Sequence, residues 1–412
     1  MTTAPMQTER PALEQSLEYD LALPPIVRFG VGRVAEIGEV VGLLGHRAWL
    51  VGGRRSLLDS PARAGLEASL AVAGIEHRVI ATTDGEPTVV QVAKALAGVP
   101  SDSHAGTVVV AVGGGAAIDL AKAVAALATN CDLARATAHD LEAVVTDHLE
   151  GVGTRSITRW PLPVVAIPTT AGTGAEATRN AVISCPRRRF KKSMRSPLMV
   201  PRAVIIDPAL GAGCERATTA AAGLDAITQL IESFICRFAR PVPRALVLDA
   251  LPRALEALPR LLADPDDLHA RAAMSHAAFV SGVALTNSGL GMAHGVAAAL
   301  GIECGTPHGV ACALMLPVAL RVNAAAAGHD LAALERAVDP AAVGDDSTCA
   351  AAFVDRIERL CREAGVPQRL AEVGLARDRI SWLADNSGGA SMRGNPVELD
   401  PARLRPILDA VW

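Results

Sequence analysis

The sequence predicts a two-domain protein in which an α/β half with a parallel sheet precedes an all-helical half. Up to about residue 208, short β-branched runs alternate with helical runs, whereas only helical patterns follow Pro208. The length of 412 residues also suits two domains better than one small core. We expect a loose tail over residues 1–20, an α/β domain over 21–208 and an all-helical domain over 209–412.

Six runs are predicted to form the strands of the sheet. Their alternation with helical runs is typical of a parallel sheet that helices cover. No element is predicted over residues 131–160, where clear periodicity is lacking. The predicted strands are an edge strand at 26–32, followed by 48–51, 78–81, 107–112, 164–168 and 203–207.

Composition limits the possible partners. Half of the residues are apolar and only 20% are charged, which allows a large buried interior. The net charge of -4 gives no basic surface for nucleic acid, and we find no apolar run near the roughly 20 residues that span a bilayer. The polar start has no signal-peptide core, and the eight cysteines form no C-x-x-C pair. We therefore expect a soluble cytoplasmic protein that binds small molecules.

A glycine loop, Gly113, Gly114 and Gly115, follows a predicted strand and precedes a predicted helix. Three glycines allow backbone N–H groups to approach a pyrophosphate, and the helix N-terminus adds its positive end. The pattern differs from G-x-G-x-x-G, and by itself a tight strand-to-helix turn explains it equally well.

A threonine loop, residues 168–176, follows another predicted strand. It contains Thr169, Thr170 and Thr173, which supply hydroxyl groups, and two glycines. Two such loops at the carboxyl ends of strands in one domain favour a bound nucleotide over coincidence.

Asp225 and Gln229 lie one turn apart in the run 221–232. Apolar residues recur there at helical intervals, so the two side chains share one face of a helix. Two oxygen donors then point in the same direction.

Two histidines near predicted helix ends complete a candidate metal site. His294 lies on an Ala-rich helical stretch that we expect to end near Gly301. Thr306 and Pro307 offer an N-cap and a first helical residue for a helix that restarts at His308. With Asp225 and an amide oxygen, two imidazoles suit Zn²⁺ or Fe²⁺ with a coordination position open to a substrate oxygen. A single buried histidine is more often a core residue.

Four segments together resemble the iron-containing (group III) alcohol dehydrogenases, which share a dehydroquinate synthase-like fold. The resemblance covers nearly the whole chain and implies a dinucleotide-binding α/β domain, an all-helical metal-binding domain, homodimers, and reduction of aldehydes or ketones with NAD(P)H. The segments are GGGAAIDLAK at 113–122, PTTAGTGAE at 168–176, IIDP at 205–208, and GMAHG with PHG within 291–309.

The resemblance also implies roles for individual residues. Asp225, His294 and His308 would be catalytic metal ligands, with Gln229 either a fourth ligand or a residue that orients the others. The residues expected along the cofactor are Gly53, Gly113, Gly114, Gly115, Asp119, Thr169, Thr170, Thr173 and Lys191.

Two departures from the family pattern leave rival functions open. Gln229 stands where the family usually has histidine, and Ala298 stands where a second histidine is common near the substrate. Loss of the imidazole at 229 predicts weaker metal retention. The rivals are a metal-free or catalytically idle nucleotide-binding protein and a dehydroquinate synthase-like lyase, although the threonine loop fits the dehydrogenases better.

Two basic segments bear on cofactor and substrate. After the strand 48–51, Gly53 stands where an acidic residue would grip a ribose, and Arg54 and Arg55 follow, so we favour NADP(H) over NAD(H). The cluster 187–192 is most simply a solvated face. If some of its cations turn inward, an anionic aldehyde would be favoured.

Overall fold

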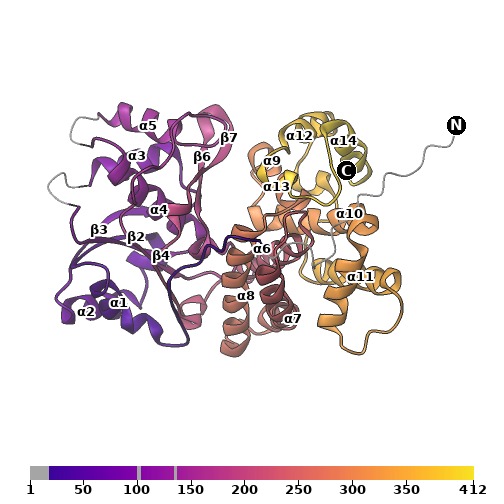
Figure 1. Ribbon diagram of the computed structural model, residues 1–412, viewed down its shortest axis with the longest axis horizontal. Coiled ribbons are helices and arrows are strands. Elements are labelled where there is room, and N and C mark those ends of the chain that lie inside the picture. The colour runs from indigo at the N-terminus through magenta and orange to yellow at the C-terminus, as the bar shows by residue number, and fades with distance from the viewer. Residues whose placement is uncertain (1–17, 100–103, 134–136) are drawn as a thin grey trace.

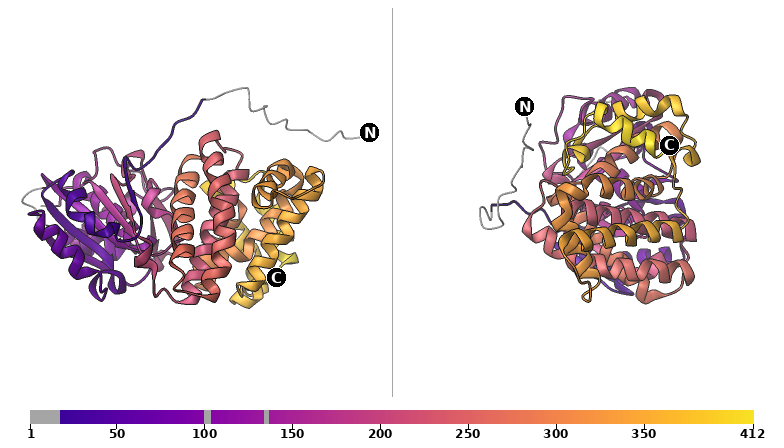
Figure 2. Two further views of the ribbon diagram at one scale, coloured as in Figure 1. Left: turned by 90° about the horizontal axis from the view of Figure 1, so that it is seen from below. Right: turned by 90° about the vertical axis from the view of Figure 1, so that its right-hand side faces the viewer.

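The computed structural model describes residues 18–99, 104–133 and 137–412. The α/β half and the helical half lie next to each other along the long axis of the molecule (Figures 1 and 2). Most of the expected tail, residues 1–17, lies outside the described residues.

The first half contains a six-stranded parallel sheet, as predicted. Its order is β1-β8-β5-β4-β2-β3, with β1 at one edge. The strands are β1 (Ile26–Phe29), β2 (Arg47–Gly53), β3 (Glu76–Thr83), β4 (Thr107–Gly113), β5 (Val164–Pro168) and β8 (Ala203–Ile206). Gly113 pairs with Pro168 where β4 and β5 end, so the glycine and threonine loops leave the sheet side by side.

Helices cover both faces of this sheet because its central strands are apolar on both sides. On one face, Trp49 and Val109 belong to the cluster that includes α3 (Val89–Ala97), α4 (Gly115–Asn130) and α5 (Ala138–Asp147). On the other, Leu50 and Val110 pack with α1 (Ile37–Gly42) and α2 (Arg63–Val72). The two groups of helices lie on opposite sides of the sheet in Figure 1.

Two features of this half were not predicted. Helix α5 occupies part of the segment 131–160 that was left without an element. An antiparallel hairpin of β6 (Asn180–Cys185) and β7 (Phe190–Arg195) contains the basic cluster, whose Arg187, Arg188, Arg189 and Lys192 are exposed, as expected of a solvated face.

The turn of this hairpin reaches the helical half. Arg189 has φ 49 and is the only residue other than glycine with positive φ in the described part of the chain. Its guanidinium lies 2.8 Å from the Glu303 carboxylate, which also binds Arg379 at 2.6 Å. The three side chains bridge the two halves.

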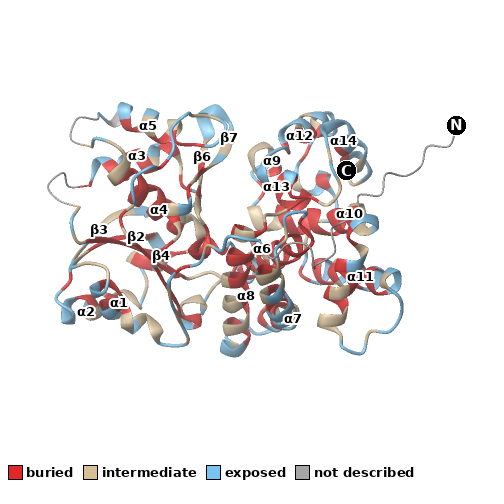
Figure 3. Ribbon diagram, viewed as in Figure 1, coloured by how far each residue is buried: buried red, intermediate tan, exposed pale blue. Residues whose placement is uncertain are grey.

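The second half is all-helical among the described residues, which confirms the prediction. Buried residues gather along its central helices and along the sheet of the other half (Figure 3). The helices are α6 (Arg216–Ile235), α7 (Pro241–Ala263), α8 (Leu268–Asn287), α9 (Met292–Cys304), α10 (His308–Val338), α11 (Asp346–Glu363), α12 (Ile380–Asn386), α13 (Ala390–Arg393) and α14 (Pro401–Ala410).

Helix α10 corrects the expectation that no segment could span a bilayer. By length and composition it is the one described helix that passes that test. Yet 67% of its most apolar window is buried inside the protein, as in the core helix of a globular domain. Its Leu316 and Leu320 pack into the largest apolar cluster of this half.

The ends of α9 and α10 differ in detail from the prediction. Helix α9 continues past Gly301 to Cys304 and is capped by Gly305 in the left-handed conformation, with φ 69. Helix α10 begins at His308 as predicted, but its N-cap is Pro307, which has no side-chain cap. The expected Thr306 cap is therefore absent.

Candidate active site

A cleft of about 440 Å³ lies between the two halves. Both halves line it, as expected from the positions of the two sets of predicted residues. Of the predicted residues, it brings together Gly115, Asp119, Thr173 and Lys191 from the α/β half and Asp225, Gln229, His294 and His308 from the helical half.

The glycine loop packs directly against the threonine loop. Gly113 has φ 152, and a Cβ at that position would lie 2.7 Å from Ala117 Cβ. A Cβ at Gly114 would lie 3.0 Å from Thr170 Oγ1, and one at Gly115 would collide with Thr173 Oγ1. Only glycine lets the start of α4, with its free N–H groups, approach the second loop this closely. This cradle suits a pyrophosphate.

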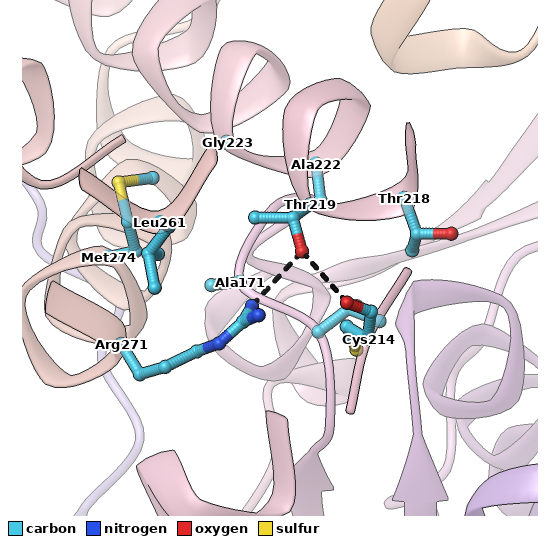
Figure 4. Close-up of a pocket in the computed structure, with 10 residues that line it drawn as sticks. Ala171, Cys214, Thr218, Thr219, Ala222, Gly223, Leu261, Arg271 and Met274 are labelled. Carbon is cyan, nitrogen blue, oxygen red and sulfur yellow. Dashed lines mark hydrogen bonds between the residues drawn. The ribbon is translucent and has the colours of Figure 1, made fainter. Parts of the chain in front are cut away.

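The helical half supports the threonine loop from behind (Figure 4). The buried Arg271 donates to Thr219 Oγ1 at 3.1 Å, and Thr219 donates to the carbonyl of Cys214 at 3.5 Å. Thr169 and Thr170 line small cavities beside Arg271 and are absent from the lining of the large cleft. Thr170 Oγ1 also lies next to Gly114, so this threonine is placed between the glycine loop and the cavities beside Arg271.

Gly53 lies at the end of β2, also outside the lining of the cleft. A Cβ there would lie 2.6 Å from Ser56 Oγ. The Ser56 hydroxyl donates a hydrogen bond to the Val112 carbonyl at 3.2 Å. Close packing of Ser56 between β2 and β4 is thus a second reason for glycine at this position.

Asp119 and Lys122 form a buried cross-link in the α/β half. Asp119 Oδ2 accepts from the Val182 amide at 3.0 Å, and its Oδ1 lies 3.3 Å from Lys122 Nζ. Lys122 also donates to the Ala175 carbonyl and to Thr178 Oγ1, at 2.8 and 2.7 Å. Burial raises the pKa of Asp119 and lowers that of Lys122. The pair ties α4 to β6 and to the threonine loop.

Lys191 lies on β7 at the cleft and is paired with Glu86, a residue that the sequence analysis did not single out. Burial acts to raise the pKa of Glu86, but the ammonium of Lys191 lowers it overall. Arg195 is likewise paired, with Glu150 at 2.8 Å. Lys191 of the basic cluster and Arg195 just beyond it are thus already paired with carboxylates.

Asp225, His294 and His308 converge at the other end of the cleft. His294 Nε2 lies 3.3 Å and His308 Nε2 lies 3.9 Å from Asp225 Oδ1. A fourth group, the thiol of Cys312, joins them, and the ligand atoms of all four residues lie within 4.8 Å of one another. Cys312 was not predicted, although its place one turn after His308 on the same helix face was a usable signal.

Two of the convergent atoms, Asp225 Oδ1 and His294 Nε2, are buried and lack hydrogen-bond partners. His308 Nδ1, the ring nitrogen that does not face Asp225, is also buried and unsatisfied. Such atoms are costly in a protein interior unless a ligand, ion or water binds them. Carboxylate, imidazole and thiol are all ligands for a divalent transition metal, so the donor set fits one.

Gln229 lies one turn from Asp225, as predicted, but its amide oxygen points elsewhere. Its Nε2 donates to Asp225 Oδ2 at 3.1 Å, while its Oε1 accepts from Ser281 Oγ at 2.7 Å. The carboxylate can only accept, so it selects the NH₂ side of the amide. Gln229 therefore orients Asp225 here.

Glu232 fixes the orientation of His294 and was also not predicted. Its Oε2 lies 2.7 Å from His294 Nδ1, and its Oε1 accepts from the Ala293 amide at 2.7 Å. This bond at Nδ1 turns Nε2 toward Asp225, an arrangement common for metal-ligating histidines. The position of Glu232, seven residues after Asp225 on the same helix face, could have indicated it.

The local field differs between the two histidines. Burial acts to lower the pKa of His294, but Cys312 and the carboxylates of Asp225 and Glu232 hold it well above its ordinary value. Burial and the charge of Lys191 lower the pKa of His308 to about 4. Burial raises the pKa of the Cys312 thiol to about 12. Neutral His308 is a competent metal ligand.

Both halves match models of one protein family. Residues 24–208 match the iron-containing alcohol dehydrogenase model, and residues 219–412 match the C-terminal model of the Fe-containing alcohol dehydrogenase family. The chain belongs to the iron-containing alcohol dehydrogenase family. It is accordingly an oxidoreductase, a metal-dependent alcohol dehydrogenase linked to a nicotinamide nucleotide, and the predicted family and activity are confirmed.

Individual relatives agree over nearly their whole length. Lactaldehyde reductase of Escherichia coli (strain K12) is 31% identical, covering 93% of this chain and 97% of the relative. The crystal structure of a 1,3-propanediol oxidoreductase is 29% identical with a TM-score of 0.85, covering 96% of this chain and 100% of that one. A sulfoacetaldehyde reductase from Bifidobacterium kashiwanohense, solved with NAD⁺, is 27% identical with a TM-score of 0.82, covering 96% and 99%.

Proposed function

We propose that this alcohol dehydrogenase reduces a small aldehyde in the cleft, with Asp225, His294 and His308 holding a divalent metal and the glycine loop holding the dinucleotide. The observation that carries the proposal is the set of unsatisfied atoms at Asp225, His294 and His308 in the cleft that Gly115 also lines. When bound, the metal would polarise a carbonyl oxygen and the reduced nicotinamide would supply hydride.

The protein's own groups would bind and orient the reactants. Glu232 holds His294 with Nε2 facing Asp225, and Gln229 holds Asp225 from the other side. Ala298 lines the cleft and carries no proton, so the proton would come from water or from a ribose hydroxyl of the cofactor. The roles in cofactor binding remain predictions for all nine residues, namely Gly53, Gly113, Gly114, Gly115, Asp119, Thr169, Thr170, Thr173 and Lys191.

For the cofactor, we propose NADP(H). Gly53 offers no carboxylate to repel a 2'-phosphate, and Arg54 and Arg55 are exposed beside it. Arg55 forms an ion pair with Glu215 at 3.3 Å, and its exposure leaves it accessible to a phosphate. The structurally similar sulfoacetaldehyde reductase was solved with NAD⁺, so the two cofactors must be compared directly.

For the substrate, an anionic aldehyde is the finer proposal. Lys192 lines the cleft, and no ion pair of its ammonium is seen within the described part of the chain. The pairing of Lys191 with Glu86 reduces the positive charge available. A structural relative acts on sulfoacetaldehyde, whose sulfonate is an anion, which supports this class.

We further propose a cytoplasmic homodimer with a boundary between domains at residues 208 and 209. The free state of all eight cysteines is consistent with a reducing compartment. The edge strand β1 leaves Val27 and Phe29 38% and 39% exposed, and an apolar sheet edge is a surface that a second copy can cover. The two family models meet near the proposed boundary.

A substitution at His308 tests the proposal. We expect His308→Ala to lose bound metal by elemental analysis and to lose aldehyde-dependent oxidation of NADPH and NADH, with an unchanged circular dichroism spectrum. His276→Ala is the matched control, because that histidine is bonded to Asp249 on α7 and does not line the cleft. Full activity and full metal content in His308→Ala would refute the assignment. Neutral and anionic aldehydes tested with each cofactor would decide the finer proposals.

A further inference from the structure

We infer that Cys312 is a metal ligand of this enzyme and takes the coordination position for which Gln229 is not available. The inference rests on the proposed function, because it concerns the metal held by Asp225, His294 and His308. It assigns a thiolate to the site and thereby favours Zn²⁺ over Fe²⁺.

The distances between donor atoms fit a tetrahedral ion. Metal bonds of about 2.0–2.1 Å to nitrogen or oxygen and about 2.3 Å to sulfur place tetrahedral ligands roughly 3.4–3.6 Å apart. Cys312 Sγ lies 3.7 Å from His308 Nε2, and Asp225 Oδ1 lies 3.3 Å from His294 Nε2. Asp225 Oδ1 lies 3.9 Å from His308 Nε2. Small adjustments would bring all four atoms onto one ion.

The hydrogen bonds of Gln229 exclude its oxygen from the same role. Asp225 binds the NH₂ group and Ser281 binds the oxygen, so coordination by Gln229 would break both bonds. The amide would also have to turn its oxygen toward the carboxylate of Asp225. Cys312 needs no such change, because its thiol is fully buried and already beside His308.

Charge and burial agree with this assignment. Binding forms a sulfur–metal bond and releases the thiol proton to solvent, so Cys312 and Asp225 together supply two negative charges to a divalent ion. The ion and its direct ligands then carry no net charge, and the Glu232 carboxylate lies outside them at His294 Nδ1. With Gln229 as the ligand instead, the ion and its direct ligands would keep one positive charge.

Cobalt spectroscopy of the full-length enzyme tests the assignment. The metal-free protein is loaded with Co²⁺ and its absorption spectrum is recorded. We expect a near-ultraviolet thiolate-to-cobalt charge-transfer band in the wild type and in Gln229→Ala, and no band in Cys312→Ser. Cys349→Ser is the matched control, because Cys349 is also buried and its thiol lies 3.8 Å from the Gly344 carbonyl. It should keep the band.

Metal affinity and X-ray absorption give two further readouts. Cys312→Ser should bind Zn²⁺ at least about tenfold more weakly and lose most of its preference for Zn²⁺ over Fe²⁺. If that variant does not fold, zinc-edge X-ray absorption of the wild type decides the matter: one sulfur at about 2.3 Å supports the assignment, and a shell of nitrogen and oxygen only overturns it.

The outcomes separate this inference from the proposed function. Stoichiometric Co²⁺ binding without the band would overturn the role of Cys312 and leave the metal-dependent reductase intact. No binding of Co²⁺, Zn²⁺ or Fe²⁺ would overturn both. A band that persists in Cys312→Ser would also reject the assignment.

Discussion

The two ends of the cleft differ in whether their buried polar groups have hydrogen-bond partners. The buried Lys122 and the largely buried Asp119, in the α/β half, satisfy each other together with backbone and hydroxyl partners. Asp225 and His294, in the helical half, are buried, but each keeps an atom without a hydrogen bond. The first pair has all its partners within the protein, whereas the second needs a ligand to occupy its unpaired atoms. Hydrogen-bond satisfaction thus separates structural from functional charges here.

Asp225→Asn should have the largest effect, a loss of metal binding and activity at the ligand-binding end of the cleft. The amide keeps the size of the side chain but removes the anionic ligand, so bound metal should be lost and kcat/KM should fall by about a thousandfold or more. The metal-free variant should still fold, because the amide oxygen of asparagine can accept from Gln229 in place of Asp225 Oδ2. Asp249→Asn, at an exposed carboxylate on α7, is the control. Retention of metal and activity would contradict the prediction.

Lys122→Met should destabilise the α/β half, where Lys122 and Asp119 are each other's partners. It leaves the Asp119 carboxylate buried without its ammonium, and we expect a loss of about 3–5 kcal/mol in unfolding free energy by urea denaturation. Adding Asp119→Asn should recover part of this loss, because the amide is neutral. If the single variant is as stable as the wild type, the cross-link is not structural.

Glu176→Gln should change how the unfolding free energy depends on pH. Burial raises the pKa of Glu176 from 4.5 to about 7 in the folded protein. As pH rises, Glu176 therefore loses its proton at a lower pH in the unfolded chain than in the folded protein. The contribution of the protonated side chain to the unfolding free energy is complete below pH 4.5 and is lost as pH rises through 7. The shift is worth on the order of 3 kcal/mol. Unfolding measured from pH 5 to 8 should show Glu176→Gln gaining stability over the wild type toward pH 8. Parallel stability curves would refute this.

Glu232→Gln should give the smallest of these effects. The amide can still accept from Ala293 but holds the His294 imidazole less strongly, so metal affinity should fall about 10–100-fold. Competition with a chelator measures the change. Glu335→Gln, at a buried carboxylate paired with Arg356, controls for loss of a buried charge elsewhere. Equal affinities in the wild type and Glu232→Gln would show that Glu232 does not tune the site.

Local patterns were sufficient to predict much of the fold. The alternation of short β-branched runs with helical runs predicted the parallel sheet. The glycine and threonine loops were predicted correctly at the ends of two of its strands. Helical spacing put Asp225 and Gln229 on one face, and the structure joins them by a hydrogen bond. The prediction that His294 and His308 join them rested on two expected helix ends, and the family resemblance then supported it.

The missed features depend on contacts between distant segments or are masked by composition. Positive charges over residues 187–192 concealed strand β7, whose pairing with β6 decides its conformation. Cys312 on an Ala-rich helix looks like an ordinary core cysteine until His294 is placed beside it. The orientation of Gln229 depends on Ser281, 52 residues away, which no pattern around Gln229 reveals.

The bridge between Arg189, Glu303 and Arg379 has a kinetic consequence. Any widening of the cleft that separates the β6–β7 hairpin from α9 must first break the contact of Arg189 with Glu303. Arg189 is 60% exposed there, so dissolved salt screens the attraction. The dissociation rate of the dinucleotide should therefore rise with ionic strength even though neither side chain touches it. Where nucleotide release limits turnover, the enzyme would run faster in brine than in dilute buffer.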